Sequence, residues 1–127
     1  MTNFFKLIFY ISILILTIIS VYPGSLIGFL LYNDFSQQPN FVRNPYGSDI
    51  NHFISYLYVS LLGLFLHLKK RDFNKTLYGL LFLSVILELL QLIIPNRSFE
   101  IMDLIFNILG VIVAYLITKI YLLIIKI

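Results

Sequence analysis

Long apolar runs, separated by short polar segments, make up most of this chain. Four of the runs are long enough to cross the roughly 30 Å hydrocarbon core of a bilayer as α-helices. They cover approximately residues 4–22, 50–68, 76–94 and 101–125. Within them apolar residues do not alternate with polar ones, as they would in the strands of a membrane β-barrel. The pattern predicts one all-α domain over residues 1–127, built as a bundle of four transmembrane helices.

The composition assigns the chain to the integral membrane proteins. Hydrophobic residues make up 60% and charged residues 12% of the sequence, and the mean hydropathy is +0.95. Four spans leave little of the chain for a soluble enzyme domain. The first run ends at Pro23 and Gly24, and residues 25–32 are expected either to lie along the membrane interface or to extend a bent helix. The lack of cysteine excludes disulfides, thiolate metal sites and thiol nucleophiles.

Basic residues cluster between the second and third apolar runs and predict the orientation in the membrane. Segment 69–75 holds four basic residues against Asp72, whereas the segment between the first two runs holds only Arg43 against Asp34 and Asp49. Short cytoplasmic loops retain Lys and Arg. Further basic residues add to the same side: Lys6, Lys119 and Lys126. We therefore expect both termini in the cytoplasm, and the net charge of +3 indicates topology and lipid contact, not nucleic-acid binding.

A group of polar residues interrupts the third and fourth runs near their shared end. Glu88 and Gln91 are three residues apart, and Asp103 and Asn107 are four apart, so each pair lies on one face of its helix. The polar face of the fourth run continues as a small-residue face at Gly110 and Ala114. Small residues allow helices to approach closely, so this face should contact protein and not lipid.

The short connection between these two runs brings their polar faces to one depth. About six residues, 95–100, join the runs, which requires antiparallel neighbours. With a rise of about 1.5 Å per residue, Glu88 and Asn107 both lie roughly 9 Å below the hairpin, and Gln91 lies near Asp103. An ionised Glu88 facing lipid would cost about 2.5 kcal/mol or more on insertion scales, so it needs a partner, water or a proton.

The start of the second run adds a third polar strip near the same depth. Asp49, His52 and Tyr56 follow one another at intervals of three and four residues. The cluster then contains more carboxylates than Arg97 alone neutralises. Three solutions remain open: a protonated Glu88, a cationic His52, or a metal ion or cationic ligand group held among the carboxylates.

The spacing of these residues forms a longer motif that extends over both helices. It resembles the VanZ-like family of small bacterial membrane proteins, whose pattern is Glu-Leu-x-Gln, Pro-x-Arg, an acidic residue, Asp and Asn-x-x-Gly. The matching residues are Glu88, Gln91, Pro95, Arg97, Glu100, Asp103, Asn107 and Gly110. The segment around His52 is similar to the family's Asp-Lys-x-x-His-Phe, with Ser48 and Asp49 in place of the Asp and Lys. The resemblance covers about residues 48–116. It implies a polytopic plasma-membrane protein, related to one that confers resistance to the glycopeptide teicoplanin.

We predict a ligand-binding site on the outer side of the membrane. Its residues are His52, Glu88, Gln91, Arg97, Asp103 and Asn107. In the favoured hypothesis the site binds a lipid-linked or cell-wall-related ligand, with Arg97 contacting an anion and with Glu88 and Asp103 contacting hydroxyl or amine groups. Candidate partners are membrane lipids, a cell-wall precursor, another membrane protein and further copies of this chain. No cofactor and no metal ion is assigned.

Two other classes of function remain open. A membrane enzyme would use Glu88 or His52 as an acid or base, with the option of a metal ion held by these residues and Asp103. A structural subunit would use the polar faces to bind a partner protein. Each residue also has a purely structural explanation: Glu88 and Gln91 as an interhelical clamp, Asp103 as a charge at a helix N-terminus, and Arg97 as an anchor among headgroups.

Overall fold

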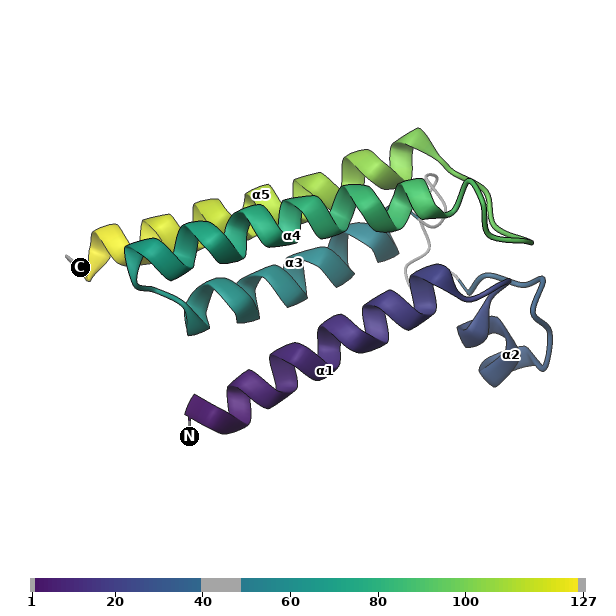
Figure 1. Ribbon diagram of the computed structural model, residues 1–127, viewed down its shortest axis with the longest axis horizontal. Coiled ribbons are helices and arrows are strands. Elements are labelled where there is room, and N and C mark those ends of the chain that lie inside the picture. Colours follow the sequence, from purple (N-terminus) through teal and green to yellow (C-terminus); the bar gives the residue numbers. More distant parts are fainter. Residues whose placement is uncertain (1, 40–48, 126–127) are drawn as a thin grey trace.

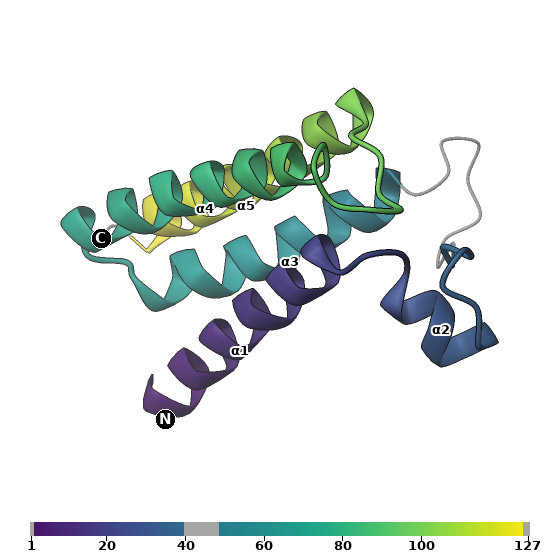
Figure 2. The ribbon, with the colours of Figure 1, turned by 45° about the vertical axis from the view of Figure 1, so that its right-hand side comes forward.

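Helices account for all the regular structure in the described part of the chain. The computed structural model describes residues 2–39 and 49–125. Along these ranges lie α1 (Thr2–Val21), α2 (Leu26–Tyr32), α3 (Asp49–Leu66), α4 (Lys70–Leu90) and α5 (Ile101–Ile124). Helices α3, α4 and α5 run side by side, and α1 crosses them at an angle (Figure 1 and Figure 2). The predicted all-α membrane bundle is confirmed.

The four long helices have the apolar character of membrane spans. Each of α1, α4 and α5 contains a stretch that is long and apolar enough to cross a bilayer, and α3 is apolar but shorter. With its 18 residues, α3 is about 27 Å long, at the lower end of what crosses the hydrocarbon core. Helix α1 begins and α5 ends at the same end of the bundle, and the α4–α5 connection lies at the other end (Figure 1).

Helix α4 begins within the basic segment, whereas the apolar pattern predicts a start near residue 76. Only residues 67–69 separate α3 from α4, so the basic residues must belong to the first turn. Asp72 lies in that turn, where a carboxylate suits the positive end of the helix dipole. The early start therefore follows from a very short connection and not from hydropathy.

Helix α4 also ends earlier than the predicted residue 94. After Leu90 the N–H groups of Leu92 and Ile93 bond carbonyl oxygens three residues back, which tightens the chain into turns. Pro95 then disfavours a helical conformation for the residue before it. The connection to α5 is therefore residues 91–100, longer than the six residues predicted.

The contact between α3 and α5 is the most extensive between any two described helices. Gly110 allows the two backbones to approach, because a Cβ atom there would lie 2.7 Å from the carbonyl oxygen of Phe53 and 2.9 Å from the backbone nitrogen of Leu57. Ala114 and Thr118 continue the same face and are fully buried. As predicted, the small-residue face of α5 contacts protein and not lipid.

Helix α1 packs at the edge of the bundle, on α3 and α4. Its one buried large side chain among the described residues is Phe9, which packs closely over Gly63. Most other large apolar side chains of α1 are exposed, as expected for a helix that faces lipid; examples are Leu7, Leu14 and Ile18. The apolar packing of α1 is therefore limited, and its C-terminal end is held by a different kind of contact, described below.

A compact turn ends α1 and leads into α2. Gly24 adopts φ +88°, a conformation that a side chain would strain, and the Ser25 hydroxyl accepts a hydrogen bond from the N–H of Gly28 at 2.9 Å. The chain then folds back, since the N–H of Ser25 donates to the carbonyl of Phe35 at 2.8 Å and the rings of Phe29 and Phe35 stack 4.2 Å apart. Helix α2 is thus a separate element and not an extension of α1. Its location at the membrane interface stays a prediction.

Candidate functional site

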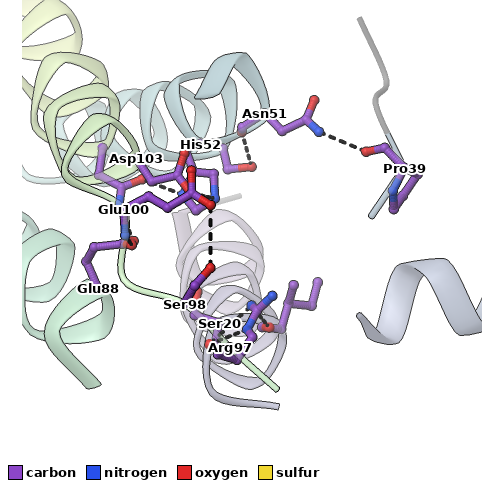
Figure 3. Close-up of polar contacts among 12 residues, drawn as sticks. Ser20, Pro39, Asn51, His52, Glu88, Arg97, Ser98, Glu100 and Asp103 are labelled. Atoms are coloured by element: carbon purple, nitrogen blue, oxygen red, sulfur yellow. Dashed lines mark hydrogen bonds and ion pairs between the residues drawn. The ribbon is translucent and has the colours of Figure 1, made fainter. Parts of the chain in front are cut away.

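A chain of hydrogen bonds joins α3, α4 and α5 at the end of the bundle that holds the α4–α5 connection (Figure 3). Nδ1 of His52 lies 3.0 Å from Oδ1 of Asn107. The amide nitrogen of Asn107 donates to Oε2 of Glu88 at 3.2 Å, and the backbone N–H of Glu100 donates to Oε1 at 3.4 Å. Each oxygen of Glu88 therefore accepts one hydrogen bond, and Asn107 connects Glu88 to His52.

His52 contacts an acceptor through each ring nitrogen. Nδ1 of His52 faces Asn107, and on the other edge of the ring Nε2 lies 3.3 Å from Oδ2 of Asp103. Because the amide nitrogen of Asn107 points to Glu88, the amide oxygen faces the ring and accepts. An imidazolium carries a proton on both nitrogens and satisfies both acceptors. The geometry therefore favours a cationic His52 paired with Asp103, which is one of the three solutions that the sequence leaves open.

Helical spacing explains why these side chains meet. Asp103 and Asn107 are one turn apart on α5, on the face that contacts the first turn of α3, where His52 lies. Glu88 and Asn107 are each only 1% exposed, so their hydrogen bond replaces contacts with water that burial removes. The predicted meeting of the two polar faces is confirmed. The ligand-binding role of the residues stays a prediction.

Arg97 binds the C-terminal end of α1, a contact that the sequence does not reveal. Its Nη2 donates to the carbonyl oxygens of Ile19 at 2.8 Å and Ser20 at 3.2 Å, and its Nε donates to Ser20 at 3.4 Å. In a continuing helix the carbonyl of Ile19 would accept from residue 23, but Pro23 has no N–H. The guanidinium supplies the missing donor. Arg97 therefore caps α1 and ties it to the α4–α5 connection.

Arg97 also contributes to the charge balance of the site. It lies within electrostatic range of Glu88 and Asp103. Burial lowers the pKa of Arg97 below its usual value, and the two carboxylates offset part of this shift. The guanidinium stays charged at neutral pH. Together with a cationic His52, it offsets the two buried carboxylates. Asn107 stands between His52 and Glu88, and in the described part of the chain no three potential metal ligands come together.

Two adjoining cavities lie beside this group of residues, and Glu88 and Asn107 line neither of them. The first measures about 360 Å³ and has mainly polar walls, which include Gln91, Asn96, Ser98, Glu100 and Asp103. The second measures about 260 Å³ and lies among α1, α2 and α3, with apolar walls that include Leu16, Ile19, Leu26, Ile27 and Ile54. Both are lined by Gln38, His52 and Arg97. The predicted neighbours Gln91 and Asp103 thus share the wall of the polar cavity.

Some residues of the cavities were not predicted as part of the site. Gln38 and Asn96 come from irregular segments, where no periodicity indicates which way a side chain points. Tyr56 continues the strip of His52 and lines the apolar cavity, and its buried hydroxyl has no hydrogen-bond partner among the described residues. The side chain of Asp49, also part of that predicted strip, lies outside the described part of the structure, as do residues 40–48.

Fold and site together define a small helical membrane protein with a buried polar group at one end of its bundle. Residues 4–124 match the family model described as VanZ/LLP1. Because the match covers nearly the whole chain, the protein belongs to the VanZ/LLP1 family, and the resemblance carried by the motif is confirmed. No curated protein and no solved structure matches the chain.

Proposed function

We propose that this protein resides in the bacterial plasma membrane and binds a lipid-linked or cell-wall-related ligand at its polar site. The observation that carries the proposal is the junction of a polar and an apolar cavity, which share Gln38, His52 and Arg97. An amphiphile also has one polar and one apolar part, since its headgroup needs hydrogen-bonding partners and its acyl chain needs apolar walls. One ligand can therefore occupy both cavities.

The size and position of the cavities support this proposal. Small-molecule sites usually measure roughly 300–1,000 Å³, and these cavities measure about 360 Å³ and about 260 Å³. The apolar cavity is lined by residues of α1 and α2, and both helices also carry exposed apolar side chains, such as Ile18 and Leu30. A ligand chain between α1 and α3 can thus enter from the bilayer without passing through water.

The distribution of charge supports a site on the outer side of the membrane. The basic first turn of α4 lies at the end of the bundle opposite the polar site (Figure 1). Short connections rich in Lys and Arg stay in the cytoplasm. A site on the outer side meets lipid-linked precursors of the cell wall, and we propose this contact as the basis of the glycopeptide resistance that the family resemblance implies.

Lipid retention tests the proposal. The protein is reconstituted in nanodiscs of phosphatidylethanolamine and phosphatidylglycerol, transferred to mild detergent, and the retained lipid is measured by native mass spectrometry. Ile27→Trp fills the apolar cavity, and Ile120→Trp makes the same change on an exposed face of α5. We expect Ile27→Trp to lose most of the retained lipid and Ile120→Trp to keep the wild-type amount. Equal retention in the two variants would refute binding at this cavity.

An acid–base enzyme is the second candidate, favoured by the pairing of His52 with Asp103 on the wall of the polar cavity. A general base needs a ring nitrogen that faces its substrate, whereas both nitrogens of His52 contact protein oxygens. Binding is therefore the better-supported function. A lipid species that accumulates in wild-type nanodiscs, and does not with His52→Gln, would establish the enzyme; unchanged lipid masses would support binding.

A further inference from the structure

Two opposite charges on the wall of the polar cavity are not paired with each other. Arg97 and Glu100 both line this cavity. Arg97 donates to backbone carbonyls of α1, and the carboxylate of Glu100 accepts from the hydroxyl of Ser98 at 3.4 Å. Among the described residues neither forms an ion pair, in contrast to His52 and Asp103. Figure 3 shows Ser98 between Glu100 and Arg97.

The fold holds the guanidinium of Arg97 and the backbone of Glu100 in place before a ligand arrives. Glu100 is the residue at the N-terminal cap of α5, and its backbone N–H donates to the buried Glu88. Arg97 uses Nε and Nη2 to bind Ile19 and Ser20, so the two N–H groups of Nη1 have no partner within the described ranges. A site that is already ordered loses less conformational entropy on binding. The pair is therefore suited to recognise two separate charges on one ligand.

The charged side chains on the cavity wall are two cations and two anions when His52 is protonated, namely Arg97 and His52, and Asp103 and Glu100. The buried Glu88 does not line the cavity and adds one negative charge behind the wall. A headgroup with a strong net negative charge lacks compensation here, because His52 is already paired with Asp103. A headgroup with one cation and one anion matches Glu100 and Arg97 one for one. Uncharged polar side chains complete the wall: Gln38, Gln91, Asn96 and Ser98.

We propose that the polar cavity selects the zwitterionic headgroup of a membrane lipid, with its ammonium group on Glu100 and its phosphate on Arg97. This inference rests on the proposed lipid-binding function and adds the charge class of the ligand. An ammonium group has only hydrogen-bond donors, and these pair with the acceptor oxygens of a carboxylate. The N–H groups of a guanidinium form charge-assisted hydrogen bonds to the oxygens of a phosphate. Because Glu100 is exposed, the selectivity it provides is modest, roughly threefold to fivefold.

Competition between two lipids in one nanodisc tests the selection. Phosphatidylethanolamine, which is zwitterionic, and phosphatidylglycerol, which is anionic, are supplied in equal amounts with identical acyl chains. Native mass spectrometry then gives the ratio of the two lipids retained by the protein. We expect the wild type to retain about threefold to fivefold more phosphatidylethanolamine. Glu100→Gln should bring the ratio to one or below without changing the total lipid. Asp72→Asn removes a carboxylate at the far end of α4 and should keep the wild-type ratio.

The ratio of the two retained lipids tests the zwitterion inference. The total amount of lipid retained by Ile27→Trp tests the proposed lipid-binding function, so the two can fail separately. A wild-type ratio of one, a preference for phosphatidylglycerol, or an unchanged ratio in Glu100→Gln would overturn the zwitterion inference while leaving lipid binding intact. Water-soluble glycerophosphoethanolamine carries the same phosphodiester headgroup without the acyl chains and should not displace the retained lipid. Displacement would assign the cavity to a soluble zwitterion and overturn the lipid part of the inference.

Discussion

Replacing Gly110 with alanine should push α3 and α5 apart and disrupt the polar site. The added Cβ would lie 2.7 Å from the carbonyl oxygen of Phe53, 2.9 Å from the backbone nitrogen of Leu57 and 3.0 Å from Cβ of Tyr56. Backbone atoms and a Cβ cannot rotate away. To bring the closest contact from 2.7 Å to the 3.4 Å of ordinary van der Waals contact, the helices must separate by about 0.7 Å.

The expected loss of stability follows from this overlap. Overpacking of a close-packed core lowers the free energy of unfolding by about 1–3 kcal/mol. Gly79 is a matched control, because it also lies inside a helix and a Cβ there would meet no atom within 4 Å. At such an open position alanine stabilises a helix over glycine by about 0.5–1 kcal/mol. Gly110 also lies inside a helix, so both variants receive this gain and it cancels between them. Gly110→Ala should therefore be less stable than Gly79→Ala by the overpacking loss alone, roughly 1–3 kcal/mol.

The same displacement acts on the site. Gly110 is one turn from Asn107, and Phe53 follows His52, so separation of the helices at Gly110 lengthens the 3.0 Å contact between Nδ1 of His52 and Oδ1 of Asn107. An increase of about 0.7 Å takes this pair beyond hydrogen-bonding distance. Gly110→Ala should thus retain less lipid as well as unfold earlier.

Thermal unfolding in detergent, followed by far-ultraviolet circular dichroism, measures the stability of both glycine variants. Native mass spectrometry of the same samples measures lipid retention. We expect a lower midpoint and less lipid for Gly110→Ala, and a midpoint at or above wild type with normal retention for Gly79→Ala. If the two variants have the same midpoint, α3 and α5 do not approach as closely as the structure shows, and the reasoning is refuted.

Four further predictions concern single side chains. Glu88→Gln leaves only one acceptor for the two donors that contact the carboxylate, so stability should fall by about 1–3 kcal/mol, and an unchanged midpoint would contradict this. Arg97→Ala removes the cap of α1 and should speed amide exchange at the end of that helix; unaltered exchange would show that the cap is unimportant. Tyr56→Phe deletes a buried hydroxyl without a partner in the described residues and should raise the midpoint, whereas a lower midpoint would reveal a partner. In this cysteine-free chain, Ser98→Cys should react with an impermeant maleimide added outside cells and Asn74→Cys should not, and the reverse pattern would invert the topology.

Much of the site was predictable because it follows helical periodicity. The spacing of Asp103 and Asn107 placed both on one face of α5, and the short connection placed Glu88 opposite them. The insertion cost of a buried carboxylate then required a partner, which the structure shows to be Asn107. The exact ends of α4 were less predictable, because connection length and Pro95 decided them more than hydropathy did.

The sequence by itself determined that the chain is a bundle of apolar helices and which faces of those helices are polar. Both properties depend on local patterns, on the burial of apolar side chains and on the need to satisfy backbone polar groups in lipid. Only the tertiary structure decided that Arg97 caps α1, through bonds to residues 77 and 78 positions away in the chain. It also decided that His52 and Arg97 line both cavities. Such features depend on how helices and irregular segments pack in three dimensions. The periodicity of residues along one helix predicts which of its faces is polar, but not which distant segment contacts that face.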